Sequence, residues 1–364
     1  MLSHIIGAEV SVTDESRIFW VNSDSGPAPS SKDEKTILGM SVDDPPSTDH
    51  MPLREQFTKH YLQIREWLNT HSERPGVTLL AMSPDAVHGA AFLAAKPNNV
   101  STAIIGRHSK ADLRLKDDAS LSLRHIALLL FPHPDDGRPC RYRLLDLRSA
   151  TAFLDERGKR LRALEADGPA FVRVGHYALL VFATSGADEP WPEDPEAGWA
   201  RIPSRLYLDE VETEKKSKEW EANSDKAWEV DALPSMSSSP TLVHNVAGPE
   251  MAVHELLDSN EAPSGELLIT SSRGAATVIL GHRAVQSGIL LGRSRRCDAG
   301  KVLSDRAISR VHILIIEIAG VLYAIDTASS NGIFEDEARE RATPLEPGSS
   351  ISLSDVAIIE WRTN

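Results

Sequence analysis

The sequence has very little cysteine and no long apolar run. Its two cysteines among 364 residues, Cys140 and Cys297, are too few for a disulfide framework, do not favour a metal site and fit a reducing compartment. No apolar run approaches the roughly 18 residues that span a bilayer. Residues Met1 to His4 lack the basic-then-apolar pattern of a secretory signal. We therefore expect a cytoplasmic protein without membrane insertion.

The chain also lacks an excess of positive charge. It has 39 lysines and arginines against 53 aspartates and glutamates, which gives a formal net charge of −14. Nucleic-acid binding depends on a broad basic face that releases counterions from many phosphates, so this balance argues against a nucleic-acid partner. Aromatic residues make up only 5%, while 22 glycines and 22 prolines indicate many turns. The composition favours small β-rich modules joined by open chain.

Motifs of catalysis are absent as well. The sequence contains no glycine-rich nucleotide loop, no His-Glu-x-x-His, no Cys-x-x-Cys, no Gly-x-Ser-x-Gly and no kinase loop. His312 closely follows Ser309, but no orienting carboxylate completes a catalytic arrangement. We therefore predict that the protein is not an enzyme and has no catalytic residues, no cofactor and no metal.

One stretch of the acidic chain reverses the charge balance. Between Arg293 and Arg310 the only acidic residues are Asp298 and Asp305. The basic residues of this stretch are Arg293, Arg295, Arg296, Lys301, Arg306 and Arg310. Such a local excess of positive charge predicts an anionic ligand. Because arginine pairs with phosphate through two parallel hydrogen bonds, a phosphorylated side chain is the expected guest.

Three short motifs lie in and around this stretch, at the joints between apolar runs typical of β-strands. They are Gly292-Arg293, Ser309-Arg310-Val311-His312 and Asp326-Thr327-Ala328-Ser329-Ser330-Asn331-Gly332. Together and in this order they resemble the forkhead-associated (FHA) domain, a β-sandwich whose loops at one end bind phosphothreonine peptides. We therefore expect residues 265–364 to form such a sandwich.

The resemblance implies a role for each motif residue. The residues expected to bind the phosphopeptide are Arg293 and Ser309 on the phosphate, Arg310 as an additional contact, and Asn331 with Ser330 on the peptide backbone. The residues expected to keep the loops in shape are Gly292, His312 and Gly332. By the same resemblance, the partner would be a phosphothreonine protein marked by an upstream Ser/Thr kinase.

An earlier part of the chain repeats these motifs. It contains Gly106-Arg107 and Ser122-Leu123-Arg124-His125, and Gly106 to His125 spans 19 positions where Gly292 to His312 spans 20. We therefore interpret residues 75–185 as another FHA-like β-sandwich. The fold class predicted for the chain is all-β, with two sandwiches.

The first copy departs from the family pattern at its third loop. That loop is Ser149-Ala150-Thr151-Ala152, and a threonine lacks the paired donor and acceptor with which the Asn331 amide would hold a peptide backbone. Two alternatives follow for this domain. It is either a weaker phosphate reader or a structural copy whose surface serves protein contacts. The residues of the weaker site would be Arg107, Ser122, Arg124 and His125.

The remaining segments are predicted from composition and periodicity. In the extension formed by residues 1–74, helical spacing of apolar residues predicts an amphipathic helix over 52–71 that packs on the neighbouring domain. The first 50 residues stay unassigned, although Ile18 to Val21 resembles a short strand. Residues 186–264 form an acidic linker rich in proline and serine. Four of the seven tryptophans lie there, so parts of it should dock on a domain or a partner.

Two linker threonines, Thr213 and Thr241, lie in sequence contexts that suggest accessibility. If a kinase phosphorylated either one, the phosphate-binding loops of the same chain could capture it, because a short tether gives a high effective concentration. The simpler interpretation is that both are ordinary exposed threonines.

Two functions from different classes remain. The first is a phosphothreonine-dependent adaptor whose C-terminal domain binds the marked peptide. The second is a phosphate-independent scaffold that uses both sandwiches as interaction surfaces. The incomplete motif of the first copy and the tryptophans of the linker favour some scaffold role.

Overall fold

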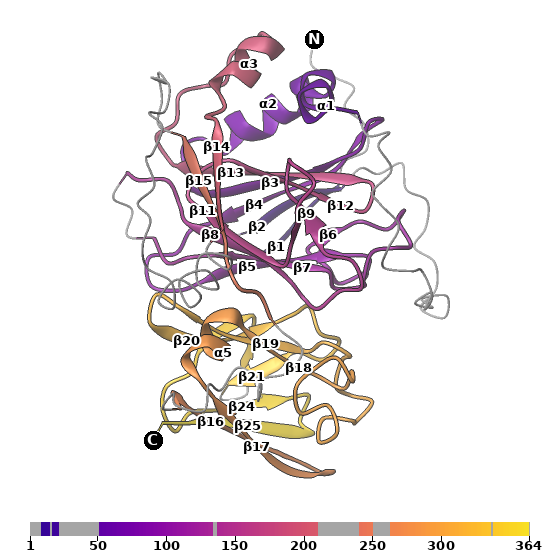
Figure 1. Cartoon of the computed structure of the whole chain (residues 1–364), viewed down its shortest axis with the longest axis vertical. Helices are drawn as coiled ribbons and strands as arrows, with labels where there is room; N and C mark the ends of the chain where they lie inside the picture. The colour runs from indigo at the N-terminus through magenta and orange to yellow at the C-terminus, as the bar shows by residue number, and fades with distance from the viewer. Residues whose placement is uncertain are drawn as a thin grey trace, which may run out of the picture.

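Four β-sheets are stacked in the protein, and a layer of helices covers the first of them (Figure 1). The computed structural model describes residues 9–14, 17–21, 51–133, 137–209, 240–249, 263–335 and 338–363, and of the first two ranges only the backbone. Strands dominate, so the all-β class predicted from the sequence is confirmed. We number the sheets 1 to 4 from the helical layer downward in Figure 1.

The N-terminal sandwich consists of sheets 1 and 2. Sheet 1 has eight strands, in the order β1 (Glu9–Asp14), β2 (Arg17–Val21), β4 (Val87–Ala94), β3 (Pro75–Met82), β13 (Tyr177–Ser185), β12 (Ala170–Val174), β9 (Phe153–Leu154) and β10 (Arg160–Leu161). Sheet 2 has seven strands, in the order β14 (Arg205–Asp209), β15 (Thr241–Asn245), β11 (Ala163–Ala166), β8 (Tyr142–Asp146), β7 (Ile126–Leu130), β5 (Ser101–Gly106) and β6 (Leu113–Arg114).

The C-terminal sandwich consists of sheets 3 and 4. Sheet 3 has four strands, in the order β18 (Ile289–Leu291), β19 (Ile313–Ile318), β20 (Val321–Asp326) and β23 (Ala342–Pro344). Sheet 4 has six strands, in the order β17 (Gly274–Leu280), β16 (Gly265–Ser271), β25 (Ala357–Arg362), β24 (Ser350–Leu353), β21 (Ile333–Glu335) and β22 (Ala338–Glu340). A short helix, α5 (His282–Ser287), connects β17 to β18.

The two sandwiches have the same strand order. The order β4-β3-β13-β12-β9-β10 in sheet 1 corresponds to β17-β16-β25-β24-β21-β22 in sheet 4. Likewise, β11-β8-β7-β5 in sheet 2 corresponds to β23-β20-β19-β18 in sheet 3. This correspondence is what the internal repeat of the sequence predicts, and the N-terminal copy adds strands at the edges of both of its sheets.

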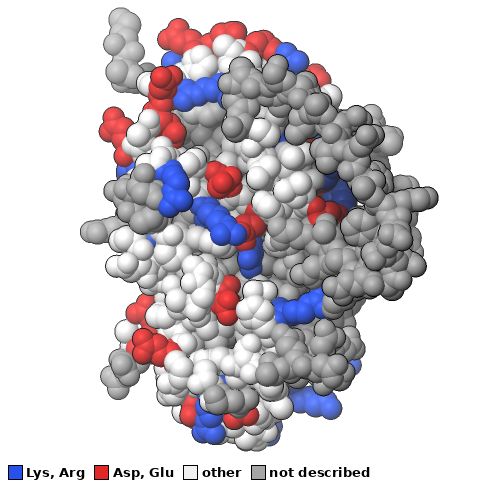
Figure 2. All heavy atoms as spheres, turned by 60° about the vertical axis from the view of Figure 1, so that its left-hand side comes forward, with Lys and Arg blue, Asp and Glu red and all other residues white. Residues whose placement is uncertain are grey.

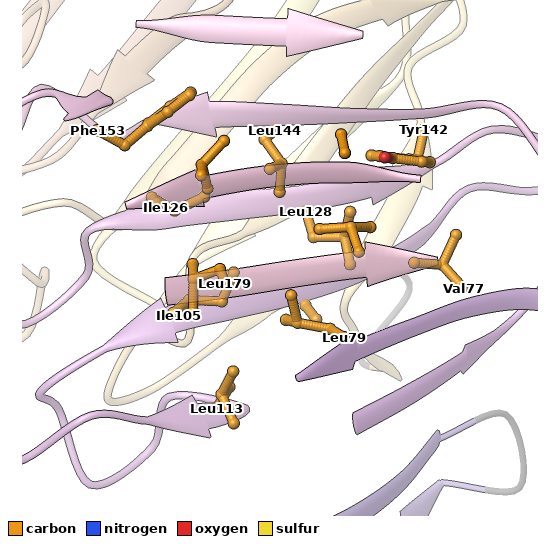
Figure 3. Close-up of a cluster of buried hydrophobic side chains, with 14 of the residues drawn as sticks. Val77, Leu79, Ile105, Leu113, Ile126, Leu128, Tyr142, Leu144, Phe153 and Leu179 are labelled. Carbon is orange, nitrogen blue, oxygen red and sulfur yellow. The ribbon is translucent and has the colours of Figure 1, made fainter. Parts of the chain in front are cut away.

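Each sandwich has its own apolar core. In the first, side chains from both sheets point into the same space, among them Leu79 of β3, Leu179 of β13, Leu128 of β7 and Leu144 of β8 (Figure 3). The corresponding core of the second sandwich includes Ile269 of β16 and Ile315 of β19. Such interior packing is the main source of stability in a β-sandwich.

A third apolar cluster joins the two sandwiches. Sheet 2 packs its outer face on the outer face of sheet 3, so sheets 2 and 3 are covered on both sides. From sheet 2 the buried residues are Ile104, Ala127, Leu129, Leu145 and Ala163. From sheet 3 they are Leu290, Leu314, Ile316, Ile318, Tyr323, Ile325 and Ala342. We call this contact the seam.

Helices cover the outer face of sheet 1. The predicted helix over 52–71 is present as two, α1 (Leu53–Lys59) and α2 (Tyr61–Thr70), because His60 leaves helical geometry at φ −104° and ψ 13°. Their buried residues, including Phe57 and Ile64, pack on apolar side chains of the sheet. The expectation that the stripe packs on the neighbouring domain is therefore confirmed.

Two described parts of the predicted linker, around α3 (Pro195–Arg201) and in β14 and β15, belong to the first sandwich. Helix α3 begins where the Asp194 carboxylate accepts a hydrogen bond from the Ala197 N–H at 2.8 Å. Trp199 packs with its ring centroid 5.3 Å from that of Phe57, and Trp191 packs against Phe182 at 5.6 Å. Strands β14 and β15 then pair in parallel at the edge of sheet 2. Docking of linker tryptophans on a domain is thus confirmed for these two.

The accessibility expected of Thr241 is wrong. This threonine is the first residue of β15, and only 6% of it is exposed because strand pairing places it inside the sandwich. In the folded protein a kinase cannot reach it. Thr213, together with Trp220 and Trp228, lies outside the described residues. Residues Ile18 to Val21 do form a strand, as part of β2.

The seam yields a test of stability. Ile316 is fully buried there, so Ile316→Ala should lower the free energy of unfolding of the whole chain by about 2–5 kcal/mol. Ile358→Ala removes the same atoms from a side chain that is 53% exposed on sheet 4 and should change it by no more than about 0.5 kcal/mol. Denaturant titration measures both. If Ile316→Ala lowers the free energy of unfolding no more than about 0.5 kcal/mol, as expected for Ile358→Ala, packing at the seam does not contribute to stability.

Candidate phosphopeptide-binding site

The first two predicted motifs meet at one end of the second sandwich. The backbone N–H of Arg293 donates to the carbonyl of Ser309 at 3.1 Å, and that of Ser294 donates to the carbonyl of Arg310 at 3.0 Å. The approach is so close that a Cβ on Gly292 would collide with the Arg310 carbonyl oxygen. Glycine is required here because the two backbones touch.

His312 joins the second motif to the third. Its Nδ1 accepts from the Ser309 N–H at 3.1 Å, and its Nε2 lies 2.9 Å from the Gly332 carbonyl. These partners correspond to a neutral ring with the proton on Nε2. Burial lowers the pKa of His312, which keeps the ring neutral near pH 7. The bonds fix the two loops relative to each other.

The third loop is held by short polar bonds. Asp326 accepts from the Ser329 N–H at 2.8 Å, and the Ser329 hydroxyl accepts from the Gly332 N–H at 2.9 Å. The Ser330 N–H donates to the Ser309 hydroxyl at 3.0 Å. The Asn331 amide donates to the Ala307 carbonyl at 2.9 Å. All three motifs thus converge on Ser309.

The five residues predicted to bind a phosphopeptide lie on these three loops. Arg293, Ser330 and Asn331 are exposed, Arg310 is partly buried, and Ser309 is only 7% exposed. Within the described part of the chain, the guanidinium of Arg293 has no hydrogen bond, ion pair or ring contact. An exposed arginine whose backbone bonds to that of Ser309, at the same loop end as the exposed Ser330 and Asn331, is suited to an anion.

The first sandwich repeats this local structure. The Arg107 N–H donates to the Ser122 carbonyl at 3.2 Å, and Nδ1 of His125 accepts from the Ser122 N–H at 3.1 Å. Nε2 of His125 lies 2.8 Å from the Thr151 carbonyl, and burial lowers its pKa as it does for His312. Arg107, however, is partly buried, and its Nε donates to the Leu121 carbonyl at 2.6 Å.

Arg124 lies on the same loop as Ser122 and His125, but its side chain contacts the second sandwich. Its side chain crosses the seam, where Nε and Nη2 donate to the Ala328 carbonyl at 3.1 and 2.7 Å. Nη2 also lies 3.5 Å from the Ser309 hydroxyl. The reason is the stacking of sheets 2 and 3, which brings the loop before β7 against the third loop of the second sandwich.

Like Arg124, Lys110 reaches across the seam to the third loop of the second sandwich. Its Nζ donates to the Ser330 carbonyl at 2.5 Å. The sequence motifs do not point to Lys110, and they give no indication that the Arg124 side chain contacts the second sandwich. A signal for the stacking was present, since the uninterrupted apolar runs Ile126–Leu130 and Ile313–Ile316 are typical of strands covered on both faces. The sequence carries no signal for which side chains meet across it.

Other polar contacts fix the seam away from Ser309. Arg148 donates to the Arg296 carbonyl at 2.7 Å and pairs with Asp298 at 2.8 Å. Arg341 pairs with Asp112 across the seam. The Arg143 guanidinium donates to the carbonyl of Gln286, in α5, at 2.9 Å.

Figure 2 shows how charged side chains are distributed on one face of the molecule. Lysine and arginine side chains lie there singly or in small groups among acidic and uncharged ones. Among the described residues, no group of three or more His, Cys, Asp or Glu side chains is placed to hold a metal ion. No helix in the same residues is long and apolar enough to cross a membrane.

Comparisons with known proteins agree with the motif assignment. The family model of the FHA domain matches residues 289–354, so the C-terminal sandwich contains an FHA domain. The chain is similar to FHA-1 of Mycobacterium tuberculosis Rv1747, with 22% identity over 28% of this chain and 99% of that one and a TM-score of 0.24. No curated protein matches the chain.

Other solved FHA structures give comparable values. The FhaA FHA domain in complex with the intracellular domain of Rv3910 has 26% identity, over 27% of this chain and 100% of that one, with a TM-score of 0.22. A structure from work on phosphothreonine-dependent FHA domain interactions has 25% identity, over 27% and 97%, with a TM-score of 0.23. Each likeness spans about a quarter of this chain.

The buried histidine gives a pH prediction. Replacing His312 by Ala strands the Ser309 N–H and the Gly332 carbonyl, which should cost about 1–3 kcal/mol of unfolding free energy at pH 7. The folded pKa is lowered, so the unfolded chain takes up the proton first. The wild-type stabilisation is therefore present above about pH 6.5 and is lost as the pH falls below it.

The difference between wild type and His312→Ala should accordingly shrink between pH 7 and pH 5. Besides burial, the charged groups acting on the ring are Asp326, Arg124 and Arg339. His282→Ala, which removes an exposed imidazole from α5, is the control. A difference that stays constant with pH would contradict a neutral, buried His312.

Proposed function

We propose that this protein is a non-enzymatic adaptor in Ser/Thr kinase signalling whose C-terminal FHA domain binds a phosphothreonine peptide. The observation that carries the proposal is the exposed Arg293, whose backbone bonds to that of Ser309 at the loop end where Ser330 and Asn331 also lie. The match of residues 289–354 to the FHA family supports it, because FHA domains are phosphopeptide-binding modules.

In the proposed complex Arg293 pairs with two phosphate oxygens in its planar fork, and the Ser309 hydroxyl donates to another. Arg310 adds positive charge. Asn331 retains its side-chain carbonyl and a second N–H for the peptide backbone, since one N–H already donates to Ala307. Three charge-assisted bonds at about 1.5–3 kcal/mol each, less the cost of ordering the peptide, correspond to micromolar affinity.

The proposed partner is a protein phosphorylated on threonine. We expect phosphothreonine to be preferred to phosphoserine because threonine carries a methyl group that serine lacks. The cytoplasm is the proposed location, and the two buried free cysteines fit a reducing compartment. Of the two candidate threonines for intramolecular capture, only Thr213 remains, because Thr241 is buried.

A scaffold role is the second candidate, and one observation favours it for the first sandwich. The Nε of Arg107 donates to the Leu121 carbonyl, and the Arg124 side chain donates to the Ala328 carbonyl across the seam. The first copy therefore serves contacts between parts of the chain rather than a phosphate of its own.

The two copies supply a matched pair of variants. In titrations of the full chain with a phosphothreonine peptide library, Arg293→Ala should weaken the best binder at least about tenfold, because charge-assisted bonds are lost. Arg107→Ala, at the equivalent position of the first sandwich, should leave binding unchanged. If no phosphopeptide binds better than its unmodified twin, the adaptor proposal is wrong. A loss confined to Arg107→Ala would move the site to the first domain.

A further inference from the structure

Two basic side chains of the first sandwich reach the loops of the second that we propose to hold phosphate. Arg124 is 7% exposed, so it is fixed by packing rather than free to sample solvent. Its guanidinium lies against the Ala328 carbonyl and within 3.5 Å of the Ser309 hydroxyl. The positive charge is therefore placed beside the hydroxyl on which the three motifs converge.

Lys110 approaches the same loop from the outside. It is exposed, as is its partner Ser330, and its Nζ donates to the Ser330 carbonyl at 2.5 Å. Ser330 in turn donates its N–H to Ser309. Arg124 and Lys110 thus contact one turn, residues 328–330, from its buried and its exposed side.

The charge of Arg124 acts on the site itself. After burial, the positive charge of Arg124 is one of the influences that lower the pKa of His312. Nearby carboxylates of the seam have other partners, since Asp298 pairs with Arg148 and Asp112 pairs with Arg341. On the Ser309 side lie Arg124 and Lys110, together with the buried carboxylate of Asp326, which accepts from the Ser329 N–H.

We infer that the phosphopeptide site is composite: the first sandwich supplies Arg124 beside the phosphate and Lys110 at the rim, where it faces the peptide next to the phosphothreonine. This inference rests on the proposed function and adds to it a specificity. Lys110, as an exposed cation beside Ser330 and Asn331, favours a peptide with an acidic residue adjoining the phosphothreonine.

The apolar seam explains how residues of another domain can take part. Burial of both sheet faces holds the two sandwiches in one arrangement, so Arg124 and Lys110 are in place before the peptide arrives. Because packing already orders Arg124, its side chain adds little ordering cost at binding, which is the usual gain from pre-organisation.

The test uses the full chain and two phosphothreonine peptides found by the library titration, one with an acidic residue beside the phosphothreonine and one with a neutral residue there. The variants are Arg124→Gln, Arg124→Lys and Lys110→Gln. Arg143→Gln is the control, because it also removes a hydrogen bond across the seam but touches Gln286 rather than the phosphate loops. Thermal unfolding of each variant reports on folding.

Arg124→Gln should weaken both peptides about tenfold or more, and Arg124→Lys should recover part of the loss because it restores the charge. Lys110→Gln should weaken only the acidic peptide, by about threefold to fivefold, as expected for an exposed ion pair. Arg143→Gln should bind both peptides as the wild type does. A purely structural Arg124 would give no such difference between Gln and Lys at equal thermal stability.

Two outcomes overturn the inference while leaving the proposed function intact. In the first, Arg293→Ala loses binding but Arg124→Gln and Lys110→Gln do not. In the second, the latter variants bind more tightly, which would make the first sandwich a cover over the site. If Arg124→Gln does not fold, Lys110→Gln decides alone. Failure of the wild type to prefer any phosphopeptide is a separate result and refutes the proposed function itself.

Discussion

The packing of sheet 2 on sheet 3 is the contact on which the rest of the structure depends. It turns two small sandwiches into one stack with three buried apolar layers between the sheets. Each of the two central sheets is therefore covered on both faces, which is uncommon for antiparallel sheets and explains their continuous apolar strands. The same contact determines which loops of one copy meet which loops of the other.

Within each sandwich, a buried neutral histidine organises the loop end. His125 and His312 accept from the N–H of the serine three residues earlier and reach a carbonyl of the third loop with their other nitrogen. The copies share this framework although their exposed groups differ. The first sandwich therefore has the same loop structure as the second, but its Arg107 is partly buried and bonds to the Leu121 carbonyl.

The sequence predicted much of this arrangement, and its failures have physical causes. Motif order and spacing were enough for the sandwich fold and for the meeting of Arg293, Ser309 and Asn331, because strand pairing brings fixed loop positions together. The break at His60 was missed because apolar periodicity continues across it. The burial of Thr241 and the contacts of Arg124 with the second sandwich were not predicted, because strand addition and domain stacking are long-range contacts that composition and local spacing do not indicate.

The face of sheet 3 that sheet 2 covers determines how a fragment of this chain would behave. A polypeptide that began near Gly265 would contain every FHA motif residue, yet it would present Leu314, Ile316, Ile325 and their neighbours on sheet 3 to water. A contiguous apolar face of that kind favours self-association. A fragment with a complete set of motif residues is therefore not expected to behave as an independent monomer in solution. The C-terminal sandwich needs the first sandwich to cover sheet 3.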